Sequence, residues 1–221
     1  ANSSTYWLNI DATATIITIN SVQNTAIATT LHTFNASTNE AANCSLYLDS
    51  TWYPNATVST SHTWARTLTE ANHTGIYYRC RDTVGNNANS NTYWLKADIS
   101  PPTMTVNSGR NTTTLITHTF SVTTNERVNC SLYLDDTWYA NTTVGTAHTW
   151  ARTLTEANHT GIYYRCTDTL AHSADSRPYW LQVDVTSPVI TINSARNTSI
   201  TTTTHIFSAS TDERTNCSVY V

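Results

Sequence analysis

The amino-acid sequence predicts an all-β chain made of tandem β-sandwich domains, and three observations lead to this fold class. The first is a long repeat, in which Cys44, Cys130 and Cys217 recur at intervals of 86 or 87 residues. A repeat of this length indicates an array of whole domains. The second is composition, because Thr, Ser and Asn are abundant while only 12% of the residues are charged, which favours strands and turns. The third is a series of short alternating segments separated by turn residues.

The strands expected within one repeat follow from this alternation. The copies at Asn43–Cys80 and Asn129–Cys166 differ at only five of 38 positions, so one description serves both. The later copy predicts strands over residues 103–108, 116–126, 129–136, 147–154, 159–168 and 178–185. Their spacing of roughly ten residues favours a sandwich over alternating strands and helices.

The domain boundaries are predicted from prolines. The segments ADISPPTMTVNS and VDVTSPVITINS are interpreted as a last strand, a short linker and a first strand. Residues 13–98 and 99–184 are then two domains, 1–12 is the last strand of a preceding unit, and 185–221 is the start of an incomplete third. This frame shift leaves two alternatives open, namely a window of a longer chain or donation of residues 1–12 to a neighbouring copy. The first is favoured because Cys217 needs a partner that residues 1–12 do not contain.

The faces of the cysteine-bearing strand are assigned by its alternation. Ile76, Tyr78 and Cys80 are expected on one face, and Tyr77 and Arg79 on the other. Tyr78 lies two residues before the cysteine, which is the position of a tyrosine corner.

The repeated tryptophans are expected inside the sandwich. Trp64 and Trp150 belong to one predicted strand of the repeat, and Trp94 and Trp180 to its last strand. The alternative is that these side chains form a platform on which sugars stack.

The cysteines predict disulfides and not a metal site. Each complete unit has two cysteines thirty-six residues apart, and no CxxC pair is present. We expect the bridges Cys44–Cys80 and Cys130–Cys166, each stabilising its unit by roughly 3–4 kcal/mol. Disulfides imply an oxidising, extracellular compartment. Buried free thiols are the alternative.

Sites for N-linked glycans are abundant. The pattern Asn-x-Ser/Thr predicts glycosylation in several turns, where a sugar does not disturb the core. Turn positions that recur in both copies are the main candidates, at Asn55, Asn72, Asn141 and Asn158. The remaining sequons are at Asn2, Asn35, Asn43, Asn111, Asn129, Asn197 and Asn216.

Other chemistries are not expected. Lys96 is the only lysine and the net charge is −4, so neither nucleic acid nor a membrane is an expected partner of this segment. The histidines recur with the repeat without forming ligand clusters, and no GxSxG elbow is present, so we expect no enzymatic activity and no catalytic or metal-binding residues. No cofactor is expected apart from covalent glycans. Calcium held between domains by Asp98 and Asp184 is an open alternative, although capping of turns by such carboxylates is favoured.

Two motifs carry a resemblance over the whole chain. The segments YYRCRDTVGN (77–86) and YWLKAD (93–98), the latter with its junction to Pro101, resemble the immunoglobulin-like tandem repeats of very large prokaryotic, especially archaeal, cell-surface proteins. The second copy reads DTLAH where the first has Gly85 and Asn86, so its hairpin should differ. Because Cys44 opens the third predicted strand, its bridge should join neighbouring strands of one sheet, unlike that of antibody domains. The resemblance implies immunoglobulin-like domains arranged as beads on a string.

The predicted function is structural. We expect a component of an extracellular, glycosylated filament or cell-surface stalk, whose partners are neighbouring units of the same chain or of identical chains. The alternative is an adhesin or carbohydrate-binding surface protein, with a cell-surface or glycan ligand. An enzyme with its catalytic domain outside this segment is a third class that the sequence does not test.

Overall fold

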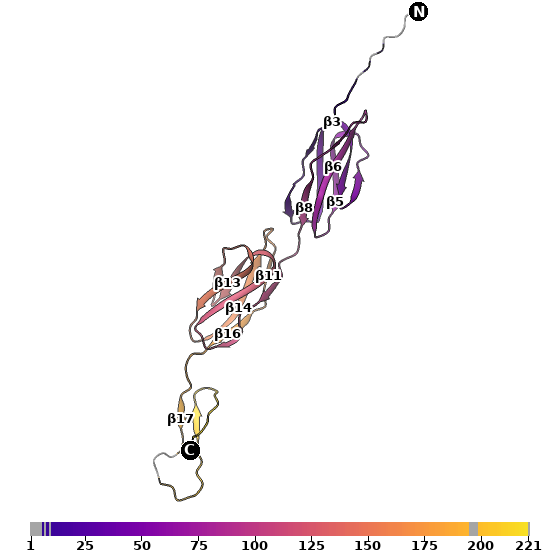
Figure 1. Ribbon diagram of the computed structural model, residues 1–221. Helices are drawn as coiled ribbons and strands as arrows, with labels where there is room; N and C mark the ends of the chain where they lie inside the picture. Colours follow the sequence, from indigo (N-terminus) through magenta and orange to yellow (C-terminus); the bar gives the residue numbers. More distant parts are fainter. Residues whose placement is uncertain (1–5, 7, 9, 195–198, 221) are drawn as a thin grey trace, which may run out of the picture.

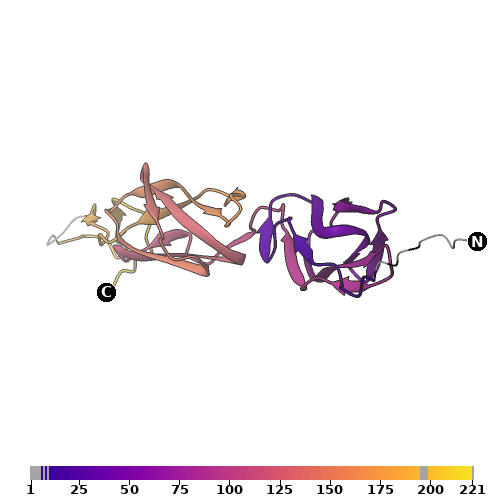
Figure 2. The same cartoon turned by 90° about the horizontal axis from the view of Figure 1, so that it is seen from above.

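The computed structural model describes residues 6, 8, 10–194 and 199–220, and within them every regular element is a β-strand. The chain folds into two sandwich units followed by a hairpin (Figure 1, Figure 2). None of the described residues belongs to a helix of the length and apolarity that a membrane span requires. The sequons at Asn2 and Asn197 lie outside the described residues.

Each unit has eight strands. The first contains β1 (Ile17–Ile19), β2 (Thr25–Ile27), β3 (Leu31–Leu48), β4 (Thr51–Pro54), β5 (Ser59–Thr67), β6 (Asn72–Asp82), β7 (Asn87–Asn89) and β8 (Tyr93–Ala97). The second contains β9 (Met104–Val106), β10 (Asn111–Thr113), β11 (Thr117–Leu134), β12 (Thr137–Ala140), β13 (Gly145–Thr153), β14 (Asn158–Thr167), β15 (Ser173–Asp175) and β16 (Tyr179–Val183). A hairpin of β17 (Ile190–Ile192) and β18 (Ala209–Thr211) follows.

The long strand β3 organises the first unit. The main path of the sheet is β1-β3-β6-β8-β2, with β4 and β5 also paired to β3 and β7 to β6. The first half of β3 pairs with β5, and its second half pairs with β6. The sheet curls so that β5 faces β6 across the core, where the rings of Trp64 and Tyr78 lie 5.3 Å apart. The second unit repeats this plan around β11.

The structure corrects the predicted strand list at β3 and β11. Two strands were expected in each, with a turn at their centre, but each is one strand of 18 residues. The break is a bulge, where the register with β5 shifts between Ser37 and Ala42. The Thr38 hydroxyl donates to the carbonyl of Glu40 over 2.7 Å, so a local side-chain bond satisfies the backbone and the strand continues. The three-residue strand β2, which pairs in parallel with β8, was too short to be predicted.

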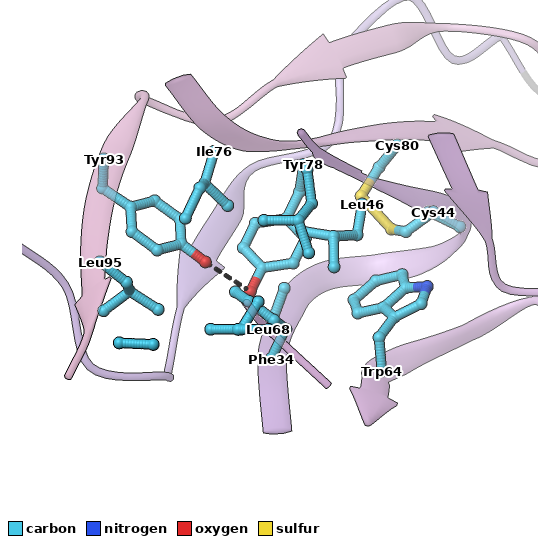
Figure 3. Packing of buried hydrophobic residues seen from close by; sticks show 14 residues of the cluster. Phe34, Cys44, Leu46, Trp64, Leu68, Ile76, Tyr78, Cys80, Tyr93 and Leu95 are labelled. Atoms are coloured by element: carbon cyan, nitrogen blue, oxygen red, sulfur yellow. Dashed lines mark hydrogen bonds between the residues drawn. A yellow bond between two sulfur atoms is a disulfide. The ribbon is translucent and has the colours of Figure 1, made fainter. Parts of the chain in front are cut away.

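The core lies between the halves of the curled sheet (Figure 3). Phe34, Leu46, Ile76 and Tyr78 are completely buried, which confirms the predicted inward face of β6. The Tyr78 hydroxyl lies 3.2 Å from the hydroxyls of both Tyr93 and Ser21. These side-chain partners, and not the backbone carbonyl of a tyrosine corner, satisfy the buried phenol. The second unit has the same arrangement at Tyr164, Tyr179 and Ser108.

The tryptophan prediction is only half correct. Trp64 and Trp150 are buried, with 4% and 5% of their surface exposed, but Trp94 and Trp180 are 39% and 43% exposed. On β8 and β16 the neighbours of Trp94 and Trp180 point inward, and a strand alternates. The exposed pair therefore lies on the outer face of its sandwich and fills no core.

Both disulfides are present. Cys44 and Cys80 face each other in the β3–β6 register with their Cα atoms 4.0 Å apart, and Cys130 and Cys166 do the same at 4.1 Å. All four are buried. Each bridge joins neighbouring strands of one sheet, as the position of the first cysteine predicted. Cys217 is free and exposed.

Replacing Cys44 and Cys80 by Ala removes one bridge and should destabilise the first unit alone. The bridge closes 36 residues, so we expect a loss of about 3–4 kcal/mol. Because the two units have separate core clusters, calorimetry should show one unit unfolding at lower temperature and the other unchanged. A uniform shift of both units, or no shift, would contradict this account of the fold.

Candidate functional site

The junctions that precede and follow each unit are built from recurring contacts. Within the linker after the first unit, the Ser100 amide and hydroxyl donate to the Glu70 carboxylate over 3.1 and 2.8 Å. Glu70 belongs to the loop between β5 and β6. The Thr186 hydroxyl donates to Glu156 in the same way after the second unit. Each linker is thereby fixed to the unit that it leaves.

The other end of each junction is held by a side-chain carbonyl or carboxyl oxygen. The Thr103 amide donates to Oδ1 of Asn125 on β11 over 2.7 Å. The same contact joins Ile16 to Asn39 over 2.7 Å and Val189 to Asp212 over 2.8 Å. A linker amide is thus tied to the unit that it enters in all three copies. Sequence reasoning missed these anchors, although Asn39, Asn125 and Asp212 do occupy equivalent positions of the repeat.

A buried carboxylate organises the β6–β7 turn beside the first junction. Oδ1 of Asp82 accepts hydrogen bonds from the amides of Val84, Gly85 and Asn86. The Asn86 side chain donates to Oδ2 of Asp82 and to the backbone carbonyls of Asp11 and Thr13. Burial raises the pKa of Asp82, but the hydrogen bonds from Asn86 and the turn outweigh it and leave the pKa lowered. Asp82 is therefore an ionised turn cap.

The second unit has an imidazole in place of the Asn86 side-chain amide. The DTLAH segment places Nδ1 of His172 2.8 Å from Oδ2 of Asp168, where the first unit has Asn86. The turns differ, as the sequence predicted, with Gly85 at φ 108° and Ala171 at φ 71°.

Ligand-type side chains gather at two of the junctions. Ligand atoms of Asp98, Asp168 and His172 lie within 4.8 Å of one another, as do those of Asp11, Glu40 and Asp82. Protein groups already engage several of them, since Lys96 Nζ lies 2.7 Å from Asp98 and His172 pairs with Asp168. Calcium held by Asp98 and Asp184 stays an open alternative to the favoured capping of turns.

A histidine clamp fixes the β3–β4 turn to the start of β6. Asp49 and Ser50 have φ of 49° and 62°, a two-residue hairpin turn. Nδ1 of the buried His73 donates to the Asp49 carboxylate over 2.8 Å, and Nε2 donates to the Thr69 carbonyl over 2.9 Å. Burial lowers the pKa of His73, but the Asp49 and Thr69 bonds outweigh it and leave the pKa raised. His159, Asp135 and Thr155 form the same clamp. His73 and His159 therefore each join two loops of their own unit.

His62 occupies a different environment. It is 1% exposed and its ring stacks 6.0 Å from the indole of Trp64. Burial lowers its pKa, so His62 is a neutral core residue.

The described sequons occupy several kinds of position. Asn72 and Asn158 are exposed at the first position of β6 and β14. Asn55 and Asn141 follow β4 and β12, and each accepts a hydrogen bond from the amide two residues later. Asn43, Asn111, Asn129 and Asn216 are exposed, whereas Asn35 is partly buried in β3. Glycosylation itself stays a prediction at all of them.

An aromatic cluster on the outer face was not predicted. The rings of Tyr47, Trp52 and Tyr77 lie 4.9–5.4 Å apart, and the Arg79 guanidinium lies 4.8 Å from the Trp52 ring. Trp52 is 38% exposed. The same cluster recurs at Tyr133, Trp138, Tyr163 and Arg165. Alternation had placed Tyr77 and Arg79 on this face, but the register of β4 against β3, which brings Trp52 opposite Tyr47, had to come from the structure.

Comparison with known proteins gives structural neighbours only. No family model and no curated protein matches the chain. Fibronectin(III)-like modules of Clostridium thermocellum CbhA are 13% identical, with 77% of this chain and 94% of that chain covered and a TM-score of 0.35. A pair of titin Ig domains is 8% identical over 76% and 96%, with a TM-score of 0.32. Part of a 1.5-MDa bacterial ice-binding adhesin is 9% identical over 85% and 71%, with a TM-score of 0.38.

The topology itself defines the class. The chain is all-β and consists of immunoglobulin-like sandwich units in tandem, each braced by a disulfide between adjacent strands.

Replacing Asp135 by Asn tests the histidine clamp. The folded-state pKa of His159 is raised, so the charged contribution is complete below the unfolded value of about 6.5 and is lost as the pH rises through the folded value. Since Asp135 is half exposed, we expect a loss of about 1 kcal/mol at about pH 5.5 and a smaller loss at about pH 9. Urea unfolding at both pH values measures it.

Asp136→Asn is the matched control, because it removes the same charge from the next residue, which accepts from the Tyr133 hydroxyl instead. Its effect should not follow the titration of His159. A loss for Asp135→Asn that grows towards high pH would contradict the clamp.

Proposed function

We propose that this chain is a structural segment of an extracellular filament or cell-surface stalk, in which serial immunoglobulin-like units give reach and resist unfolding. The role proposed is mechanical and steric, not catalytic. Its partners are neighbouring units of the same chain or of identical chains, and its surface carries N-glycans.

The observation that carries this proposal is the recurrence of the junction contacts. The linker leaves each unit through a hydroxyl–glutamate bond, Ser100 to Glu70 and Thr186 to Glu156. It enters the next unit through a hydrogen bond from a backbone amide of the linker to the side chain of Asn125 or Asp212. A linker held at both ends limits the directions in which successive units can point. Units that are joined each time by the same contacts extend in a regular series, which is what a stalk requires.

The bridges support an extracellular location and resistance to force. Cys44–Cys80 and Cys130–Cys166 are fully buried between central strands, and disulfides persist in oxidising compartments. When the ends of the chain are pulled apart, the segment between the cysteines of each unit, which are 36 residues apart, cannot extend. Each unit therefore retains a closed loop even after its sandwich opens.

An adhesin is the second candidate, and the observation that favours it is the outer-face cluster of Tyr47, Trp52 and Tyr77, in which Trp52 is exposed. Aromatic faces beside a guanidinium suit the apolar face and hydroxyl groups of a sugar. Binding of a soluble saccharide that is lost on Trp52→Ala/Trp138→Ala would favour this role.

Stretching single molecules tests the structural role. Each unit of the unmodified chain should unfold in its own event with the disulfide loop closed. In the Cys44→Ala/Cys80→Ala chain, the first unit should release about 12 nm more, because its 36 residues now extend at roughly 3.5 Å each. The second unit is the internal control. Opening of both units at forces too low to record would contradict a load-bearing role.

A further inference from the structure

The exposed tryptophan of each unit lies beside a sequon. Asn158 is opposite Gln182 in the β14–β16 register, and Trp180 is the next outward residue of β16. Diagonal neighbours on adjacent strands are about 7–8 Å apart. Asn158, Thr160, Trp180 and Gln182 line one open hollow of about 450 Å³. The acceptor asparagine, its sequon threonine and the indole thus share one surface.

The indole of Trp180 is partly exposed on the outer face of the sandwich. It is 43% exposed while Tyr179 and Leu181 on either side are buried. In the part of the chain that the structure describes, Trp180 has no aromatic or guanidinium stacking partner. Trp94 repeats the situation with 39% exposed. A partly exposed indole beside an acceptor asparagine at the same position of both units is available to a group attached at that asparagine.

A glycine keeps the space between acceptor and indole open. Gly161 follows the sequon with φ +68°, and a Cβ built on it would meet no atom within 4 Å. Gly75 has the same φ and the same free space in the first unit. The register of β14 against β16 shifts between His159 and Ile162, around this glycine. The bulge therefore leaves room above the strand pair for a group attached at Asn158.

The chemistry of the hollow suits a sugar. A pyranose ring has an apolar C–H face that packs on an indole, and hydroxyl groups around its edge that bond amides and hydroxyls. Trp180 supplies the indole, Gln182 supplies the amide and Thr160 supplies the hydroxyl group. A single stack of this kind is weak in solution, but a covalent tether raises the effective concentration to about the millimolar range or above.

We propose that the first sugars of an N-glycan on Asn158 fold back onto the indole of Trp180, and that a glycan on Asn72 does the same on Trp94. This inference rests on the glycosylated surface in the proposed function and adds a defined contact to it. The glycan would cover the outer face of the β14–β16 pair and stabilise it. The units differ at two residues of the face, since Pro178 and Gln182 occupy the positions of Thr92 and Lys96. The Nζ of Lys96 turns to Asp98 over 2.7 Å.

The experiment uses the full glycosylated chain and has two separate readouts. Glycopeptide mass spectrometry first measures occupancy at Asn72 and Asn158. Proton NMR then searches for sugar resonances that are shifted upfield by an indole ring and show nuclear Overhauser effects to it. We expect both signals, and we expect Trp94→Ala/Trp180→Ala to remove the upfield shifts while occupancy stays unchanged.

A double-mutant cycle measures the coupling. Removing the glycans with Asn72→Gln/Asn158→Gln should lower the melting temperature by about 2–6 °C when Trp94 and Trp180 are intact. The same change made in the Trp94→Ala/Trp180→Ala chain should lower it by much less. Thr74→Ala/Thr160→Ala, which blocks attachment but keeps the asparagines, should behave in the same way. Asn55→Gln/Asn141→Gln is the matched control, because β12 and β16 are separated by β14 and β11 in the sheet. Its effect should not depend on Trp94 and Trp180.

The outcomes separate the two proposals. Occupied sites without upfield sugar signals or coupling would overturn the stacking and leave the coated stalk intact. The absence of glycans at Asn72 and Asn158 would overturn the stacking. The absence of glycans at Asn55 and Asn141 as well would overturn the proposed glycosylated surface. Binding of a free oligosaccharide to Trp180 in the Asn158→Gln chain, without coupling in the glycosylated chain, would assign the indole to a partner's glycan and also overturn the proposal.

Discussion

The pairing of β3 with β6, closed by the Cys44–Cys80 bridge, is the constraint on which the rest of each unit depends. β3 carries β1, β4 and β5 along its length, and β6 carries β7 and β8, with β2 added through β8. If the two central strands separated, the remaining strands would belong to two unconnected groups. The core residues Leu46 and Tyr78 lie opposite each other in this same register, so the covalent bond and the core fix one alignment. If one of the two strands slipped by one residue, its inward side chain would turn outward.

The interactions around this pair extend its alignment to the surface. The His73–Asp49 clamp ties the β3–β4 turn to the first residues of β6, and the Asp82 cap fixes the turn where β6 ends. Asn86 then connects that cap to the segment preceding β1. A path of hydrogen bonds therefore leads from the central strands to the junction. Because both units share the clamp, an equivalent cap and the linker anchors, the same register at the centre gives the same attachment at the ends.

The sequence predicted the class of fold because the alternation of side chains along a strand is a local pattern, and the repeat shows that pattern twice. Alternation around Cys80 assigned the inward face correctly, and the cysteine spacing gave both bridges. Trp94 was misassigned because hydrophobicity alone does not tell which face of a strand an indole occupies, and its inward neighbours Tyr93 and Leu95 already fill the core. The continuous strand β3 was missed because Thr38 and Glu40 lie in a bulge whose composition is that of a turn.

The functional positions were harder to predict than the fold. Asn125 and Glu70 lie more than twenty residues from their partners Thr103 and Ser100, so no local pattern connects them. The aromatic cluster depended on the β3–β4 register, which brings Trp52 beside Tyr47. The sequon at Asn158 was visible in the sequence, but its position next to Trp180 depended on the pairing of β14 with β16.

Native-state hydrogen exchange of the full chain tests the central role of the β3–β6 pair most directly. We expect the bonded amides of β3 and β6 around Cys44 and Cys80, and those of β11 and β14 around Cys130 and Cys166, to exchange only when a whole unit unfolds. Amides of β2 and β7 should exchange by local opening at a lower free energy. If the amides around the disulfides exchanged faster than those of β5 or β8, the central pair would not hold the unit together, and the account would be contradicted.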